Sequence, residues 1–159
     1  MVAQRYFFVS NWKIQCPLED AWNTIYDVHE WCKWWPSIAE VKTISKGDAN
    51  DIGRVEYMKW TTPFFYHLSF NIELLSKQMP IVIVAHATGE LEGTGTWKFF
   101  HENGVTNIIH EWNVSTTKKW MNDLAFVLKP LFFWNHNYVM KRGAKGLAKK
   151  LNAKLISYR

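Results

Sequence analysis

Two histidines and one asparagine are the polar side chains whose positions in this sequence suggest chemistry. In a stretch of alternating apolar and polar residues, Ile108, His110 and Trp112 share one face of a predicted strand. Nearer the C-terminus, Asn137 lies within an apolar helical stripe and His136 lies at the edge of that stripe. An imidazole can serve as a general acid or base, or it can fix a ligand. His110 and His136 are therefore the candidate catalytic residues. The alternative is that both only bond neighbouring groups inside the core.

The familiar catalytic and metal-binding motifs are missing from the sequence. It contains no H-E-x-x-H pair and no nucleophile elbow, and Cys16 and Cys32 lack metal-ligand spacing. Gly89, Gly93 and Gly95 link two predicted strands, whereas a phosphate-binding loop opens a helix. We expect no metal and no cofactor, and we expect both thiols to be reduced and packed like small apolar side chains.

Aromatic residues make up 16% of the 159 residues, and ten of them are tryptophan. Rings this bulky leave gaps when they are crowded into one core, so we expect some of them either to border a cavity or to be exposed at the surface. The strand and helix periodicities give a set of predicted ligand-binding residues: Tyr57, Tyr66, Phe70, Trp97, Phe99, His110, Trp112, His136, Asn137 and Met140. We expect Trp12, Trp22 and Trp120 to pack helices against a sheet.

The helices and strands that must position these side chains are predicted from the hydrophobic periodicity and from the residues that interrupt it. Residues 6–16 predict a strand, and Pro17 then starts a helix over 18–27 with acidic residues in its first turn. A short helix over 28–35 ends before Pro36. Six further strands are predicted over 41–45, 53–60, 65–77, 81–87, 93–101 and 105–116. Residues 118–155 are predicted to be helical, with a kink or break at Pro130.

This order of elements predicts one α+β domain over residues 1–159. An antiparallel sheet of about seven strands has one apolar face to cover, and only the C-terminal helix is long enough to cover it. A curved sheet wrapped around one helix leaves a space between the two. We therefore expect a cavity between the sheet and the C-terminal helix.

The net charge of +5 is concentrated at the C-terminal end. Residues 1–117 hold 9 basic and 13 acidic groups, whereas residues 118–159 hold 10 basic groups and one acidic group. We interpret the basic side of the last helix as a solvated outer face. Binding to nucleic acid is not expected, and neither is membrane contact, although the basic face would allow it. The sequence gives no signal for an oligomeric state.

The N-terminal residues and the hydropathy favour a cytoplasmic location. No apolar run approaches the ~20 residues that cross a bilayer. Residues 1–10 lack the basic region, apolar stretch and cleavage site of a signal peptide.

Several motifs along the whole chain form a recognisable set. They are Pro17 to Ala21 followed by Trp22, Trp34-Trp35-Pro36, Gly89-Glu90-Leu91-Glu92-Gly93, Glu111-Trp112-Asn113-Val114, and Trp134-Asn135-His136 with Val139-Met140 and Gly143. With the element order, these residues resemble the START/SRPBCC superfamily and its polyketide cyclase or dehydrase-like branch. The resemblance implies the helix-grip fold. It implies no single activity, because that superfamily includes lipid carriers, hormone receptors and aromatase/cyclases.

Three functions are compatible with these features. The leading hypothesis is binding of a small hydrophobic molecule, such as a lipid or a polyketide, in the cavity. The second is a cyclase or dehydratase in which His110, His136 or a tyrosine moves protons. The third is an interaction module whose exposed apolar patch meets a membrane or a partner protein. The patch residues would be Trp31, Trp34, Trp35, Phe64 and Phe65.

Overall fold

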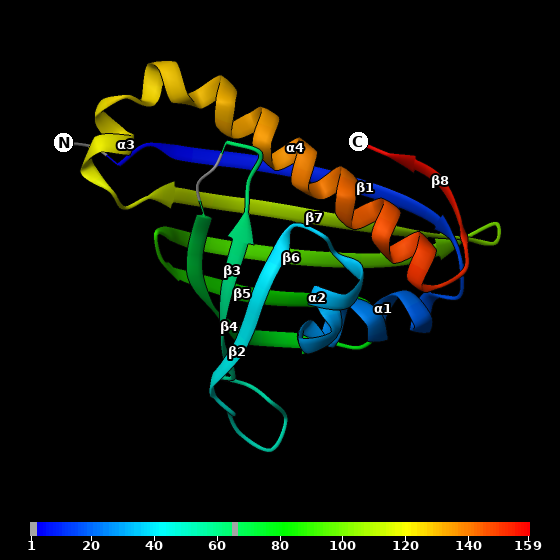
Figure 1. Ribbon diagram of the computed structural model, residues 1–159. Helices are drawn as coiled ribbons and strands as arrows, with labels where there is room; N and C mark the ends of the chain where they lie inside the picture. The colour runs from blue at the N-terminus through cyan, green and yellow to red at the C-terminus, as the bar shows by residue number, and fades with distance from the viewer. Residues whose placement is uncertain (1–2, 65–66) are drawn as a thin grey trace.

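One antiparallel sheet curves around a long C-terminal helix (Figure 1). The computed structural model describes residues 3–64 and 67–159. Eight strands are hydrogen-bonded in the order β2-β3-β4-β5-β6-β7-β1-β8. Their bounds are β1 Arg5–Gln15, β2 Ile38–Ser45, β3 Val55–Thr61, β4 His67–Gln78, β5 Val82–Gly89, β6 Leu91–Glu102, β7 Val105–Thr116 and β8 Lys154–Tyr158.

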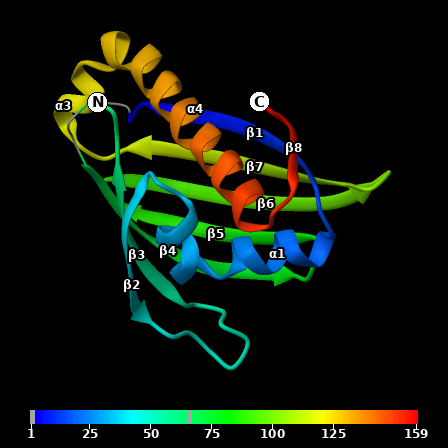
Figure 2. The same ribbon diagram turned by 45° about the vertical axis from the view of Figure 1, so that its right-hand side comes forward.

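All the helices lie in two places along the chain. Between β1 and β2 come α1 (Leu18–Tyr26), the 3-10 turn η1 (Val28–Glu30) and α2 (Trp31–Trp34), and after β7 come α3 (Lys119–Asp123) and α4 (Ala125–Lys150). Helix α4 runs across the concave face of the sheet, with α1 and α2 near its C-terminal end (Figure 2). The predicted α+β helix-grip architecture is confirmed.

The predicted C-terminal helical segment was wrong at its C-terminal end and in the position of its break. Helix α4 stops at Lys150, and the last residues form β8, an eighth strand that pairs with β1. The reversal occurs at Asn152, which has a left-handed φ of 50°. Its N–H donates to the carbonyl of Lys149, and the next N–H donates to the carbonyl of Ala148, which is the Schellman arrangement that ends helices.

The predicted helical segment is interrupted at Leu124, between α3 and α4. Pro130, where we predicted the kink or break, lies inside α4. Pro130 is the sixth residue of α4, so the one hydrogen bond that it removes lies close to the helix start. Helix formation therefore continues through the proline.

The basic side chains of α4 lie on its outer surface. Lys141, Lys145 and Lys149 are exposed, whereas Ala144 and Leu147 on the opposite side are fully buried. This confirms the interpretation of a solvated outer face on a core helix. Among the described residues, no helix combines the length and the apolar content that crossing a bilayer requires.

A cluster of tryptophans joins α4 to the sheet. Trp35 packs against Trp12, Trp31 and Trp34, with ring centroids 5.2 to 5.4 Å apart. Its indole Nε1 donates a hydrogen bond of 2.9 Å to the carbonyl of Val139 in α4. The pair Trp34-Trp35 is therefore a structural anchor for the helix.

Two glycines allow α4 to lie directly on these indoles. A Cβ at Gly143 would lie 2.5 Å from Cε2 of Trp35 and 2.8 Å from Cη2 of Trp12. A Cβ at Gly146 would overlap the carbonyl oxygen of Trp34. Since neither contact leaves room for a methyl group, the position of α4 depends on glycine at both places.

We expect the substitution Gly143→Ala to destabilise the fold. Alanine favours a helix by about 1 kcal/mol over glycine, but forcing a methyl group into a packed core costs about 1–3 kcal/mol or more. The cost of overpacking should therefore exceed the gain in helix propensity, and the free energy of unfolding measured in urea should fall. Lys145→Ala, at an exposed site of the same helix, is the control and should change it little. An unchanged or higher stability of Gly143→Ala would contradict this account of the anchor.

Candidate ligand cavity

A cavity of about 180 Å³ lies between the inner face of the sheet and α4. Its walls come from β1, from strands β3 to β7, and from the helical segments around α1, α2, α3 and α4, and they are mostly aromatic and aliphatic. For scale, an apolar cavity of about 150 Å³ holds a benzene ring. The space therefore suits a small ring system or a short branched chain.

Six of the ten predicted ligand-binding residues line this cavity. They are Phe70, Trp97, His110, Trp112, His136 and Met140. The inward face predicted for the strand around His110 is confirmed, because Ile108, His110, Trp112 and Val114 are all buried. Contact of these residues with a ligand remains a prediction.

Tyr57 and Phe99 do not line the cavity. The inner face of β3 is formed by Glu56 and Met58, so Tyr57 between them points to the other side, where its hydroxyl donates to Ser69 Oγ at 3.1 Å. Phe99 is buried as expected, but it packs against Trp22 at a ring distance of 5.2 Å. Its ring belongs to the core beneath α1.

Asn137 was placed on the wrong face of α4. It is exposed, and the residues that face the cavity at this level are Asn135, His136, Val139 and Met140. The prediction extended the apolar stripe of the C-terminal half of α4 toward the N-terminus at a fixed residue spacing. The side chain that faces the cavity is that of the preceding residue, His136. The remaining predicted residue, Tyr66, lies outside the described residues.

The predicted interaction patch was wrong for its three tryptophans. Trp31, Trp34 and Trp35 are buried in the anchor, Phe64 is exposed, and Phe65 lies outside the described residues. A different set of large apolar side chains is exposed, around α3 and in the N-terminal half of α4: Trp120, Leu124, Phe126, Val127 and Trp134. Trp120, predicted to pack against the sheet, is thus at the surface, whereas Trp12 and Trp22 are buried as predicted.

His110 is buried and His136 is partly buried, and aromatic contacts hold both rings. His110 packs against Trp97 and Trp112, with ring centroids 4.1 and 5.7 Å apart. His136 stacks on Phe8 at 4.2 Å, with an interplanar angle of 12°. These stacks fix the two rings on the cavity wall.

Burial keeps both imidazoles uncharged. Desolvation lowers the pKa of His110 to about 3, with a further contribution from His136, and it lowers the pKa of His136 to about 4. At neutral pH each ring therefore has one nitrogen that donates a hydrogen bond and one that accepts.

Several buried polar atoms at this end of the cavity have no hydrogen-bond partner among the residues that the structure describes. They are Nδ1 of His110, both ring nitrogens of His136, Oδ1 of Asn135 and the hydroxyl oxygen of Tyr6. All four residues line the cavity. An unpaired buried polar group costs about 1–3 kcal/mol, so a molecule that pairs with these atoms would recover part of that cost. The sequence analysis did not predict Asn135 and Tyr6 as site residues, because neither the strand periodicity nor the helix periodicity distinguished them from their neighbours.

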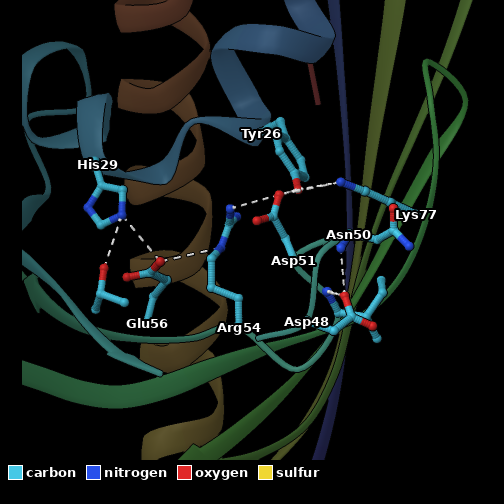
Figure 3. A network of polar contacts seen from close by, with 10 residues as sticks. Tyr26, His29, Asp48, Asn50, Asp51, Arg54, Glu56 and Lys77 are labelled. Carbon is cyan, nitrogen blue, oxygen red and sulfur yellow. Dashed lines mark hydrogen bonds and ion pairs between the residues drawn. The ribbon is translucent and has the colours of Figure 1, made fainter. Parts of the chain in front are cut away.

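A charged network lies at the β3 side of the cavity (Figure 3). Glu56 is 2% exposed, and its Oε1 lies 3.2 Å from His29 Nε2 and 3.3 Å from Arg54 Nε. Arg54 and Glu56 both line the cavity. Charged side chains are almost never fully buried unless they are paired, and Glu56 is buried beside two such partners. In the sequence, the position of Glu56 two residues before the apolar Met58 indicates that both side chains lie on the same face of the strand.

The same network continues to the loop between β2 and β3. The Tyr26 hydroxyl donates to Asp51 Oδ2 at 2.5 Å, and this hydrogen bond lowers the pKa of the Asp51 carboxyl. Lys77 Nζ donates to the Tyr26 hydroxyl at 2.8 Å and lies 3.4 Å from Asp51 Oδ2. The contacts connect α1, this loop and β4 around one end of the cavity (Figure 3).

The described parts of the chain contain no group of three or more His, Cys, Asp or Glu side chains arranged to hold a metal ion. Cys16 and Cys32 are both free thiols. Cys16 is buried as expected, but Cys32 is exposed.

The sequence matches no model of a known protein family and no curated protein. Solved structures do resemble the fold. The Zhui aromatase/cyclase from Streptomyces sp. R1128 superposes with a TM-score of 0.75 at 11% identity, over 94% of each chain. A START superfamily protein from Mycobacterium smegmatis gives 0.74 at 9% identity, over 92% of this chain and 97% of that one.

A third similar structure is a longer protein. The di-domain aromatase/cyclase StfQ, from the steffimycin biosynthetic pathway, gives a TM-score of 0.66 at 18% identity, over 92% of this chain. This chain spans about half of the di-domain protein, 51% of its length. At these identities the likeness shows the fold, and it confirms the resemblance to the START/SRPBCC helix-grip fold.

We expect the buried histidines to make stability depend on pH. Below the ordinary histidine pKa of 6.5 the unfolded chain takes up protons that the folded chain, with both pKa values near 3 to 4, does not. Stability is therefore complete above pH 6.5 and falls as the pH drops toward 4. The expected loss is about 1.4 kcal/mol per histidine between pH 7.5 and 5.5.

Urea denaturation at the two pH values measures this loss. His110→Gln and His136→Gln should each remove about half of the pH dependence, whereas His67→Gln, at an exposed site, should leave it unchanged. Equal pH dependence in all four proteins would show that the two imidazoles are not held neutral by the fold.

Proposed function

We propose that this protein binds a small, mostly apolar molecule that carries a neutral polar group, in the cavity between the sheet and α4. The observation that supports this proposal is the combination of aromatic walls with the unpaired polar atoms of His110, His136 and Asn135. Ligand sites are typically apolar with a few polar groups that fix orientation. A core selected only for stability would pair these atoms or replace them with apolar groups.

Apolar burial supplies the main part of the affinity. A ring system of tryptophan size buries about 200 Å², and at ~25 cal/mol per Å² this area contributes about 5 kcal/mol. Part of that free energy is offset by the loss of translational and rotational freedom on binding. Hydrogen bonds to the polar atoms then decide which of several similar apolar molecules is preferred.

The polar group of the ligand is expected to be neutral. With pKa values of about 3 and about 4, His110 and His136 offer no positive charge at neutral pH. A carboxylate placed against them would be desolvated without a counter-charge. A hydroxyl or carbonyl group, by contrast, can pair with a neutral imidazole and with the Asn135 side chain.

Catalysis of a cyclase or dehydratase type is the alternative use of the same cavity, suggested by the two aromatase/cyclases that share the fold. General acid–base catalysis is most effective when the pKa of the catalytic group lies near the working pH. The pKa values of His110 and His136 lie well below neutrality, so both imidazoles are weak bases. The cavity therefore favours binding over proton transfer.

Filling the cavity tests the location of the site. Ala85 lines the cavity, and its neighbour Val84 on the same strand points to the opposite face of the sheet. We expect Ala85→Phe to weaken binding of 2-naphthol at least tenfold in calorimetric titration, while Val84→Phe retains the affinity of the original protein. If no apolar probe binds, or if Ala85→Phe binds as well as Val84→Phe, the proposal fails. Native mass spectrometry of protein purified without added ligand gives an independent reading, because a bound natural molecule appears as added mass.

Replacing His136 by leucine tests the role of the polar atoms. The original protein should bind 2-naphthol more tightly than naphthalene, because the hydroxyl pairs with the polar cluster. In His136→Leu this preference should shrink several-fold, while the free energy of unfolding stays equal or rises, since an unpaired polar group is removed. A large loss of stability with the preference intact would instead give His136 a purely structural role.

A further inference from the structure

A second polar position in the same cavity lies far from the two histidines. Glu56 is on β3 and His110 is on β7, so their strands are four steps apart in the sheet order. With ~4.8 Å between neighbouring strands, the path along the sheet is on the order of 19 Å, and the direct distance across the cavity is shorter because the sheet curves around α4 (Figure 1). The two residues therefore border opposite sides of the cavity.

The carboxylate of Glu56 forms ion pairs through one of its two oxygens, and neither oxygen has a hydrogen-bond partner among the described residues. Both neighbouring nitrogens, His29 Nε2 and Arg54 Nε, lie near the same oxygen, Oε1, at 3.2 and 3.3 Å. The second oxygen, Oε2, is buried and has no hydrogen-bond partner among the described residues. A buried carboxylate oxygen without a donor is costly, more so than a neutral group.

We propose that Glu56 Oε2 accepts a hydrogen bond from a hydroxyl group of the ligand, so that the cavity selects molecules with polar groups at two ends. The inference rests on the proposed function and names the class of ligand more narrowly. A carboxylate oxygen can only accept, which requires a donor on the ligand. Arg54 beside Glu56 disfavours a cationic donor such as an ammonium group, so the donor is a neutral hydroxyl.

The resulting ligand is a compact aromatic molecule of one or two rings with a hydroxyl at one end. Its other end carries a hydroxyl or carbonyl group that pairs with His110, His136 or Asn135. The ring system between them packs on indole and phenyl side chains such as Trp60 and Phe70, which both line the cavity. A simple fatty acid fits neither end, because it has a charged head and an apolar tail.

Matched probes test the donor without any change to the protein. Two diols of different length, 2,6-dihydroxynaphthalene and 4,4′-dihydroxybiphenyl, are compared by calorimetric titration with their monomethyl ethers, 6-methoxy-2-naphthol and 4-hydroxy-4′-methoxybiphenyl. Each ether keeps the oxygen acceptor but loses the donor. We expect at least one diol to bind about tenfold more tightly than its ether. If neither diol is preferred while 2-naphthol still binds, this inference is overturned and the proposed function stands. If no probe binds, the proposed function fails as well.

Two substitutions assign the preference to Glu56. Glu56→Gln removes the charge at constant size, and Glu56→Leu removes both acceptors; each should reduce the tenfold preference for the diol to less than threefold. His29→Gln is the matched control, because His29 approaches only Oε1 and its side chain is half exposed. It should retain the full preference. Thermal unfolding and 2-naphthol binding identify variants whose cavity is intact. A preference that survives in both Glu56 variants, or that is lost equally in His29→Gln, would refute the assignment.

Discussion

The close contact between α4 and the Trp34-Trp35 pair is the constraint on which the rest of the structure depends. Gly143 and Gly146 bring the helix backbone onto the indoles, and Trp35 Nε1 binds the carbonyl of Val139. This contact fixes the height of α4 above the sheet, and that height determines how much space is left beside it. Because Trp35 also lines the cavity, one side chain both anchors the helix and forms part of the wall.

The interior separates into regions with different physical roles. Beneath α1 and α2 the aromatic rings pack against one another, which stabilises the fold and leaves little room. Around the cavity the same kinds of ring alternate with buried polar atoms that have no hydrogen-bond partner in the described part of the chain. Stability alone does not account for the second pattern, because each unpaired atom costs free energy. The arrangement is better explained by molecules that the cavity accommodates.

The sequence predicted the architecture well because periodicity and turn residues are local signals. Every predicted strand is present, with ends shifted by at most three residues within the described chain. The errors arose where a shift of one residue along a strand or helix decides which side chain faces inward. On β3 the inner face belongs to Glu56 instead of Tyr57, and on α4 it belongs to His136 instead of Asn137. The alternation of Glu56 with Met58 places both on one face of β3, but the ion pairs with His29 and Arg54 that accompany the burial of a carboxylate come from tertiary structure. The strand β8 was missed because its pairing with β1 also depends on the completed sheet.

The placement of the anchor has a consequence for how such a chain can diverge. The residues that hold α4 lie at the end of α2, directly after it and in the C-terminal half of α4. The two polar ends of the cavity come from β3, from β7 and from residues of α4 before Val139. Substitutions at the cavity ends can therefore accumulate without releasing the helix. Structures that share 9 to 18% identity with this chain keep the same fold. A scaffold of this kind can be adapted to new molecules by exchanging a few inward side chains, both in natural descendants and in protein engineering.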